Sequence, residues 1–507
     1  MQKSDQKAID IENEYSQLSL FLKDHNVEIP ESQDLDTYKM IEMIFEKNNP
    51  STAFYIINLG DIIRQLQLWR EMFPFIEPRY AVKCNPNRVI CQLLGLLGVG
   101  FDVASKNEIN LVKEYVGDIA KVIYANPYKE PSSIQYARQM DVDTATFDSE
   151  SELLKMKLYH PGCRLLIRLK VDDRGSVCKF SDKFGVDMTE VYDLLSYAKH
   201  MRLRVEGICF HVGSGCKNPV QYYSALKMAR DVFSIAEELG LQFNIIDIGG
   251  GFPGLQDDAC LDLIRGIQDN VRRGLIDFFA KDFQIPGLDY LRPEDQSDDE
   301  LPRLELIAEP GRFFVQSSHT LLVNIIGKKV KYVAPGSMVT SCGSSPEPNI
   351  ATSPTMDGAV NTVDPGLETQ GRGAAFHSNR VHSTEIASAY NPDDAVCPIG
   401  KGKYKPAERE KVYNYYLNDG IYGSFNCLVF DHANAEVLPY NERDGARYKS
   451  VIFGPTCDSV DKISANVELP ELEIGEWCFV KNFGAYTVAA ASDFNGFTKL
   501  KAFYVLC

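Results

Sequence analysis

The feature that most constrains this chain is a repeated alternation of short apolar runs with helix-like stretches between residues 51 and 320. The runs are rich in Val and Ile and include RYAVKC, RLLIRLKV, RVEGICFHV, FNIIDIGGG and LELIAEPG. This alternation is typical of a parallel β-sheet covered by helices. About eight such units over roughly 270 residues fit a (β/α)8 TIM barrel better than an open sheet.

A different pattern follows the barrel. After residue 405, β-type runs return without long helices: YGSFNCLVFDH, YKSVIFGPTC, EWCFVKNFGAYTVAAA and TKLKAFYVL. We therefore predict an N-terminal segment (1–50) that contributes to the β-domain, a TIM barrel (51–320) and an all-β, sandwich- or barrel-like domain (321–507). Residues 335–405 are rich in Ser, Thr, Pro and Gly and lack periodic apolar residues, which predicts a mobile insertion.

Composition limits the classes of partner. The net charge of −17 and pI near 5.1 argue against nucleic acid or an anionic membrane and favour a cationic small molecule. An acidic surface without any steering role explains the charge equally well. The chain shows no secretory signal and no apolar run long enough to span a bilayer. Its 13 Cys have no paired CxxC spacing, so we expect free thiols in a cytoplasmic protein and no metal site.

Chemically active residue types recur where the predicted barrel strands end, which is where barrel enzymes place their reactive groups. Each alone has a structural explanation, such as a snorkelling lysine or a core histidine. Together at successive strand ends they predict one shared site. They are Lys83, Asp102, Arg168, His211, Gly249–Gly251 and Glu309 with Arg312.

The turn DIGGGFPG formally contains the GxGxxG spacing of dinucleotide sites (Gly249, Gly251, Gly254). Pro253 interrupts that spacing, and the turn comes late in a barrel, so a phosphate cradle is the better interpretation. A phosphate site, a lysine and a carboxylate together suggest pyridoxal 5′-phosphate (PLP). Lysine forms a Schiff base with this cofactor, which then acts as an electron sink. Glu309 has the charge needed to keep the pyridine nitrogen protonated.

Eight motifs in order along the chain match one family: YAVKCN, FDVAS, FHVGSGC, DIGGGFPG, AEPGR, NDGIYGSFNC, GPTCDS and GAYTVAAASDFNGF. Over residues 50–335 and 405–507 the chain resembles eukaryotic-type ornithine decarboxylases, which are group IV, fold-type III PLP enzymes. The resemblance implies a PLP-binding TIM barrel with a C-terminal β-domain. It also implies decarboxylation of L-ornithine to putrescine and CO2, the first step of polyamine synthesis.

The same resemblance implies roles for individual residues. Lys83 would hold PLP as a Schiff base, His211 would stack on its ring and Glu309 would pair with the pyridine nitrogen. The other implied cofactor-binding residues are Asp102, Glu108, Arg168, Ser214, Gly250, Gly251, Gly311, Arg312 and Tyr486.

Residues of the β-domain are implied to complete the site. Cys457 would direct protonation to Cα, and Cys457 with Asp458 would reach into the partner's active site in a homodimer. Asp419 and Asp458 would hold the distal ammonium of ornithine. Phe494 is a further implied substrate contact, and Asn418 stands at a substrate-site position in place of a tyrosine.

Several alternatives remain open on the sequence. Arginine or lysine could be the substrate, whereas diaminopimelate has a distal carboxylate that Asp419 and Asp458 would repel. A catalytically inactive protein of the antizyme-inhibitor type is a second class. Antizyme binding, which would involve residues 131–155, is not decided by any motif.

Overall fold

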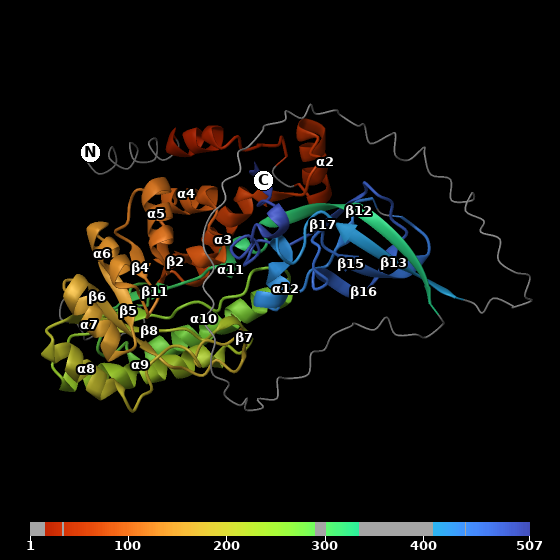
Figure 1. Cartoon of the computed structure of the whole chain (residues 1–507). Helices are drawn as coiled ribbons and strands as arrows, with labels where there is room; N and C mark the ends of the chain where they lie inside the picture. Colours follow the sequence, from red (N-terminus) through yellow and green to blue (C-terminus); the bar gives the residue numbers. More distant parts are fainter. Residues whose placement is uncertain (1–15, 33–34, 289–300, 334–408, 442) are drawn as a thin grey trace, which may run out of the picture.

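The computed structural model describes residues 16–32, 35–288, 301–333, 409–441 and 443–507, which form two domains side by side (Figure 1). The insertion predicted at 335–405 lies outside the described residues. No helix within the described ranges is both long and apolar enough to cross a bilayer.

The first domain is a closed barrel of eight strands, and each strand is parallel to its neighbours. Their Val- and Ile-rich segments are buried on both faces, which is typical of parallel strands covered by helices. The TIM-barrel prediction is thus confirmed. In order around the barrel, the strands are β2 (Glu77–Ala81), β3 (Gly100–Val103), β4 (Val122–Tyr124), β5 (Thr144–Phe147), β6 (Arg164–Leu169), β8 (Arg204–Phe210), β10 (Ile245–Asp247) and β11 (Glu305–Ala308).

Helices cover the outside of the barrel (Figure 1). Several begin at a side chain that caps the free N–H groups of the first turn: Asn87 accepts from Val89 N and Ile90 N at the start of α4 (Arg88–Leu96). A small hairpin, β7 (Ser176–Cys178) with β9 (Ser214–Cys216), lies outside the barrel sheet. The helices are α3 (Leu59–Met72), α4 (Arg88–Leu96), α5 (Lys106–Tyr115), α6 (Pro131–Gln139), α7 (Glu150–Tyr159), α8 (Val191–His200), α9 (Val220–Glu238), α10 (Asp258–Phe278) and α11 (Arg312–Val315).

The second domain is built on one eight-stranded sheet, so the prediction of a second β-domain is confirmed. Helix α2 (Thr37–Asn48) packs on this sheet through Met40, Ile41 and Ile44. The strands are β1 (Phe54–Asn58), β12 (His319–Val333), β13 (Glu410–Leu417), β14 (Leu438–Pro439), β15 (Arg447–Phe453), β16 (Lys462–Pro470), β17 (Trp477–Val480) and β18 (Lys501–Val505).

The position of strand β1 shows that the predicted start of the barrel, residue 51, is wrong. The strand falls within the range predicted for the barrel (51–320), but it pairs with β12 and β18 of the second domain. Four of its five residues are buried, so its pattern fits a central strand of either sheet and does not identify which one. The chain crosses to the barrel only afterwards, through α3.

The run YGSFNCLVFDH, predicted as β-type, is also corrected. It forms a 3-10 turn, η5 (Ser424–Asn426), and a short helix, α12 (Cys427–Phe430). The side-chain amide of Asn426 donates to Gly423 O at 2.6 Å and also to Thr487 O, which stabilises a compact turn. A short apolar run does not distinguish a strand from a buried helical turn.

Candidate active site

Lys83 lies just beyond β2, in the short 3-10 turn η1 (Val82–Cys84), at the end of the barrel where reactive groups are expected. Its Nζ forms an ion pair with the carboxylate of Asp102, which is on β3 and fully buried. Burial alone would lower the pKa of Lys83, but Asp102 and then Glu309 outweigh it, so the pKa is raised. Lys83 is therefore an ammonium held by an acid in the ligand-free chain.

A second acid, Glu309, follows β11 and is buried at the same end of the barrel. Its backbone N–H donates to Gly249 O at 2.7 Å, which ties it to the glycine turn after β10. Burial raises the pKa of Glu309 well above its usual value, and the carboxylates of Asp102 and Asp247 raise it further. The pKa of Asp247 is raised to about 7, chiefly by burial. Glu309 therefore retains a proton near neutral pH, whereas Asp247 is partly ionised there.

His211 follows β8, and burial lowers its pKa well below the usual value, so its imidazole is neutral. Nδ1 accepts a hydrogen bond from Gly213 N at 3.0 Å. The ring of Phe180 lies edge-on to it, with centroids 4.9 Å apart and an interplanar angle of 78°. Gly250 is close to the ring, since an added Cβ would lie 2.7 Å from Nε2. The imidazole is thus held in one orientation, as stacking on a planar cofactor requires.

Arg312, at the start of α11, forms the cationic part of the site. Its Nη2 donates to Ser214 Oγ at 3.1 Å and to Asp431 Oδ1 at 2.7 Å. Its guanidinium carbon lies 5.1 Å from the ring centre of Tyr486. Tyr486 has a left-handed backbone (φ 57°) and donates its N–H to Cys84 O at 2.9 Å, directly beside Lys83.

These residues fit PLP on structural grounds. Gly251 has a φ of 106°, and an added Cβ there would lie 2.8 Å from Gly213 O, so only glycine fits this turn, as in the glycine turns that bind phosphate through backbone N–H groups. Arg312 Nε and Asp102 Oδ1 are buried without a hydrogen-bond partner among the described residues. An amine, an anion cradle, a buried acid and an oriented ring therefore lie together. Gly311 packs tightly on η1, with room for no Cβ beside Cys84.

Two further predicted cofactor-site residues lie around the same barrel mouth. Arg168 on β6 is buried, and its guanidinium carbon lies 5.0 Å from the ring centre of Phe184. Glu108 on α5 accepts a hydrogen bond from Ala104 N at 2.6 Å, and burial raises its pKa. Arg168 lowers the pKa of Glu309 and of His211 by its charge, and no hydrogen bond of the described residues joins either Arg168 or Glu108 to Lys83.

The remaining predicted site residues, those implied to bind substrate, belong to the sheet domain. Asp419, after β13, is buried and accepts from Gly420 N at 2.8 Å, and burial raises its pKa to about 6. Asn418 Oδ1 accepts from Asn324 N at 2.9 Å.

Cys457 and Asp458 lie on an exposed part of this domain. Cys457 is exposed, and its N–H donates to Asn495 Oδ1 at 3.1 Å. Asp458 accepts a hydrogen bond from Tyr422 Oη at 2.5 Å, which lowers its pKa. Phe494 stacks on Tyr422 with centroids 4.2 Å apart. Within the described part of the chain, no hydrogen bond or ion pair joins Cys457, Asp458 or Phe494 to Lys83.

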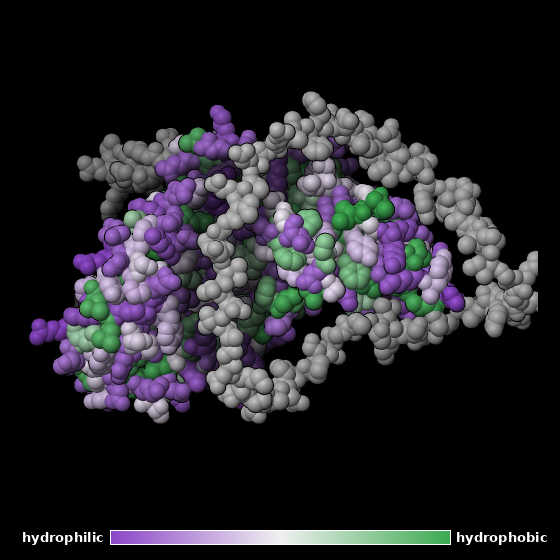
Figure 2. Space-filling model, viewed as in Figure 1, coloured by the Kyte–Doolittle hydropathy of each residue, from purple (hydrophilic) through white to green (hydrophobic). Residues whose placement is uncertain are grey.

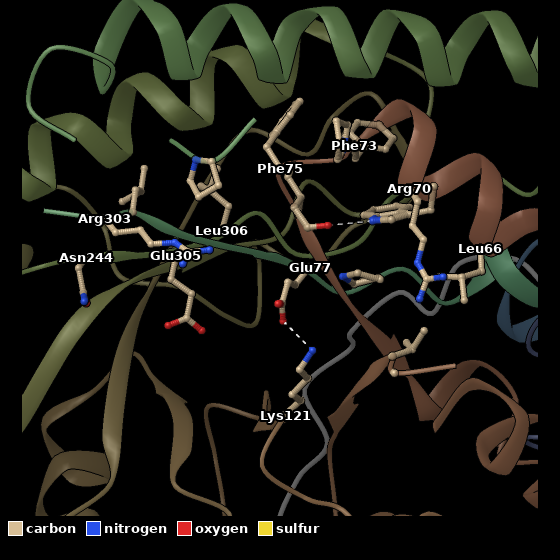
Figure 3. Close-up of a pocket in the computed structure, with 18 residues that line it drawn as sticks. Leu66, Arg70, Phe73, Phe75, Glu77, Lys121, Asn244, Arg303, Glu305 and Leu306 are labelled. Carbon is tan, nitrogen blue, oxygen red and sulfur yellow. Dashed lines mark hydrogen bonds and ion pairs between the residues drawn. The ribbon is translucent and has the colours of Figure 1, made fainter. Parts of the chain in front are cut away.

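A cavity of about 670 Å³ opens at the opposite, amino-terminal end of the barrel (Figure 3). Aromatic residues such as Phe73 and Phe75 line one part of it, and Glu77, Lys121 and Glu305 line another. Lys121 pairs with Glu77 at 3.5 Å. None of the predicted site residues lines this cavity, so it is not the candidate active site.

Two acids of the site were missed in the sequence. Asp247 stands at the end of FNIID, next to the glycine turn that drew attention instead. Asp431 follows α12 in VFDHA, a segment predicted as β-type, and it is far in sequence from the arginine it binds. For Asp247, the position at a strand end was a usable signal, whereas for Asp431 only the fold reveals the contact.

Two family models match the chain. The model described as pyridoxal-dependent decarboxylase, pyridoxal binding domain, matches residues 59–316, and the corresponding C-terminal sheet domain matches residues 395–484. The described residues of each match belong to one of the two domains.

The chain is also similar to individual proteins. It is 37% identical to ornithine decarboxylase of Mus musculus, over 90% of this chain and 80% of that protein. It is 35% identical to antizyme inhibitor 2 of Xenopus laevis, over 90% of this chain and 81% of that protein. Its structure resembles arginine decarboxylase of Paramecium bursaria Chlorella virus with a TM-score of 0.69 and 28% identity, covering 92% of this chain and 100% of that one.

Proposed function

Because the chain belongs to the pyridoxal-dependent decarboxylase family of eukaryotic-type ornithine decarboxylases, we propose that it converts L-ornithine to putrescine and CO2, the first step of polyamine synthesis. One observation carries this proposal: an ammonium, Lys83, is paired to a buried acid beside an arginine and a glycine turn at the catalytic end of the barrel. The cofactor is PLP.

When bound, PLP supplies an electron sink for the pair of electrons that CO2 leaves at Cα. Lys83 would bind the cofactor covalently, after Asp102 has held its amine in position. His211, neutral and fixed in orientation, would stack on the ring. Glu309 would share a proton with the pyridine nitrogen, and Arg168 would support the charge of the site.

The phosphate would be held at the opposite edge of this site. Arg312 supplies a permanent cation, and arginine forms strong paired hydrogen bonds with phosphate. Ser214 and Tyr486 would add hydroxyl groups. Backbone N–H groups would come from the close-packed positions Gly250, Gly251 and Gly311, as in other phosphate-binding turns. Glu108 would lie behind them as charged support.

Selection of ornithine would rest on Asp419 and Asp458, which match its distal ammonium. An unpaired buried charge costs several kcal/mol, so substrates with neutral side chains are strongly disfavoured. Lysine, which is one methylene longer, would lose only about 1–3 kcal/mol. Phe494 and Asn418 would shape the same part of the site.

We further propose a homodimer with shared active sites, in which Cys457 and Asp458 act in the other subunit. Cys457 as a thiol would give its proton to Cα. In support, Cys457 is exposed, and the sheet domain carries exposed apolar side chains, including Val460 (60% exposed), three residues after Cys457, and Phe430 (69%). Figure 2 shows hydrophobic side chains exposed over α12. Such patches commonly mark interfaces.

A complementation experiment tests this sharing. Lys83→Ala and Cys457→Ala chains, each inactive alone, should regain part of their activity when mixed, because one of the two sites in a mixed dimer is intact. Mixtures that stay as inactive as the separate chains would contradict shared sites.

Other partners and the location of the chain are also proposals. The described cysteines are free thiols, which supports a reducing cytoplasm. The similarity to antizyme inhibitor 2 favours one second candidate, an inactive regulator that binds antizyme. The chain keeps the amine, acids and thiol that such a regulator would not need, so we prefer the enzyme.

The deciding measurement is CO2 release from carboxyl-labelled ornithine, arginine and lysine by the purified chain with added PLP, with Lys83→Ala as control. Faster turnover of ornithine than of the others supports the proposal. Preference for arginine overturns the substrate, and bound PLP without any turnover favours the regulator.

A further inference from the structure

We propose that Asp431 is a positioning residue for the cofactor phosphate: from the sheet domain, it holds Arg312 in the orientation that binds PLP. This inference rests on the proposed function, because it assumes that Arg312 meets the phosphate. It adds a residue that no motif of the sequence assigned to the site.

The contact crosses the boundary between the domains. Asp431 caps the end of α12 and is 6% exposed, whereas Arg312 begins α11, next to the barrel strand β11. Arg312 Nη2 lies 2.7 Å from Asp431 Oδ1 and 3.1 Å from Ser214 Oγ. One nitrogen is therefore held between an acceptor of each domain, and the ring of Tyr486 packs against the guanidinium.

The ion pair of Arg312 and Asp431 leaves one N–H of the guanidinium and one oxygen of the carboxylate without a hydrogen bond. It is joined through one nitrogen and one oxygen, although arginine and a carboxylate can form two parallel bonds. Arg312 Nε and Asp431 Oδ2 are buried without a partner among the described residues. Buried polar groups are normally paired, so an unused N–H beside a serine and a glycine turn indicates a group kept for a ligand.

A cavity explains why the orientation needs support. A space of about 550 Å³ between the domains is lined by both Arg312 and Asp431, together with Glu436. Without the carboxylate, the guanidinium would be a buried charge with only a hydroxyl partner, and such a charge turns towards water. The cavity gives it room to do so. Binding of PLP would then require the Arg312 side chain to turn back towards Ser214, and the affinity for PLP would fall.

Two other roles are possible for the same pair, and they predict different results. Asp431 could compete with the phosphate for Arg312, in which case its removal would tighten PLP binding. It could also join the domains without affecting the cofactor, in which case removal would lower stability and affect every ligand of the site equally.

The experiment compares PLP with pyridoxal, which lacks the phosphate, by fluorescence titration of the cofactor-free full-length chain. The variants are Asp431→Ala and Asp431→Asn. Glu436→Gln is the matched control, because it removes an acid of the same cavity five residues away, at an exposed position. Thermal unfolding of each cofactor-free chain reports whether it is folded.

We expect Asp431→Ala to weaken PLP binding by about 10- to 100-fold, as for other residues that orient a ligand-binding side chain. Asp431→Asn, which keeps an acceptor oxygen, should lose less, and pyridoxal affinity and the Glu436→Gln chain should be unchanged. Equal losses for PLP and pyridoxal, unchanged PLP affinity or tighter PLP binding would each overturn the inference. A parent chain that binds no PLP would instead overturn the proposed function.

Discussion

Replacing Asp419 by Asn should separate recognition of the substrate ammonium from the rest of catalysis. Asp419 is 6% exposed, so the ammonium would be bound with little water to compensate for a lost charge. Removing one member of a buried ion pair costs about 3–5 kcal/mol. Asp458 would share the ammonium, so we expect the lower limit, about 3 kcal/mol. Since 1.36 kcal/mol is tenfold in rate, kcat/KM for ornithine should fall by roughly 150-fold.

The pH dependence supplies a second, independent observable. The pKa of Asp419 in the ligand-free chain is raised to about 6 by burial, and only its ionised form pairs with an ammonium. In the parent chain, kcat/KM should therefore fall as the pH is lowered through about 6, because kcat/KM reports ionisations of the free enzyme. Asp419→Asn should lack this part of the profile.

The variant is expected to fold. The pKa of Asp419 is raised to about 6 in the folded chain. The carboxyl therefore stabilises the fold fully below its unfolded pKa, and this stability is lost as the pH rises through about 6. At neutral pH the buried charge is thus unfavourable, and a neutral Asn should leave the unfolding temperature equal or higher.

The assay is initial-rate CO2 release with ornithine and with norvaline, which has the same carbon chain and α-amine but lacks the distal amine. Asp419→Asn should slow ornithine and leave the slow reaction of norvaline unchanged. Asp444→Asn, at an exposed position of the same domain, is the control and should behave as the parent. If Asp419→Asn turned ornithine over as fast as the parent, or slowed both substrates equally, the assignment of Asp419 to the ammonium would be refuted.

Two further substitutions test the barrel side of the site. Asp247→Asn removes a charge that raises the pKa of Glu309, so the acidic limb of the kcat profile should move to lower pH; an unmoved limb would show that Asp247 does not act through Glu309. Gly250→Ala would place a Cβ 2.7 Å from His211 Nε2 and should weaken PLP binding in a fluorescence titration. Gly162→Ala, whose Cβ would meet nothing within 4 Å, should bind PLP as the parent does, and equal affinities in all three chains would contradict the close fit.

The barrel was predictable because two features of its strands are visible in the sequence: the apolar run of each strand and the polar residues at its carboxyl end. Buried parallel strands are continuous apolar runs, and their carboxyl ends are marked by residues that a strand interior does not tolerate, such as Lys83 and Glu309. The same rule placed Asp102 and His211. It could not place β1, since a five-residue apolar run satisfies either sheet.

The contacts of the site were less predictable than its members. Asp431 and Arg312 are separated by 119 positions, and neither carries a local signal for the other. Asp419 and Asp458 were identified through the resemblance, and the hydrogen bonds that they accept, from Gly420 N and from Tyr422 Oη, were not predictable from the sequence. Sequence patterns indicate which face of a strand or helix a residue occupies. Contacts between residues of different domains depend instead on how the two domains pack together.

The two domains contact each other directly beside Lys83. The carbonyl of Cys84, next to Lys83, accepts the N–H of Tyr486 at 2.9 Å, and the amide of Asn85 donates to Gly484 O at 2.9 Å. The two residues that follow Lys83 in the sequence thus hold the segment between β17 and β18 of the second sheet. With the arginine–aspartate pair, these contacts place the domain boundary at the proposed cofactor site. Cofactor affinity should therefore be sensitive to substitutions at this boundary that leave the barrel itself folded.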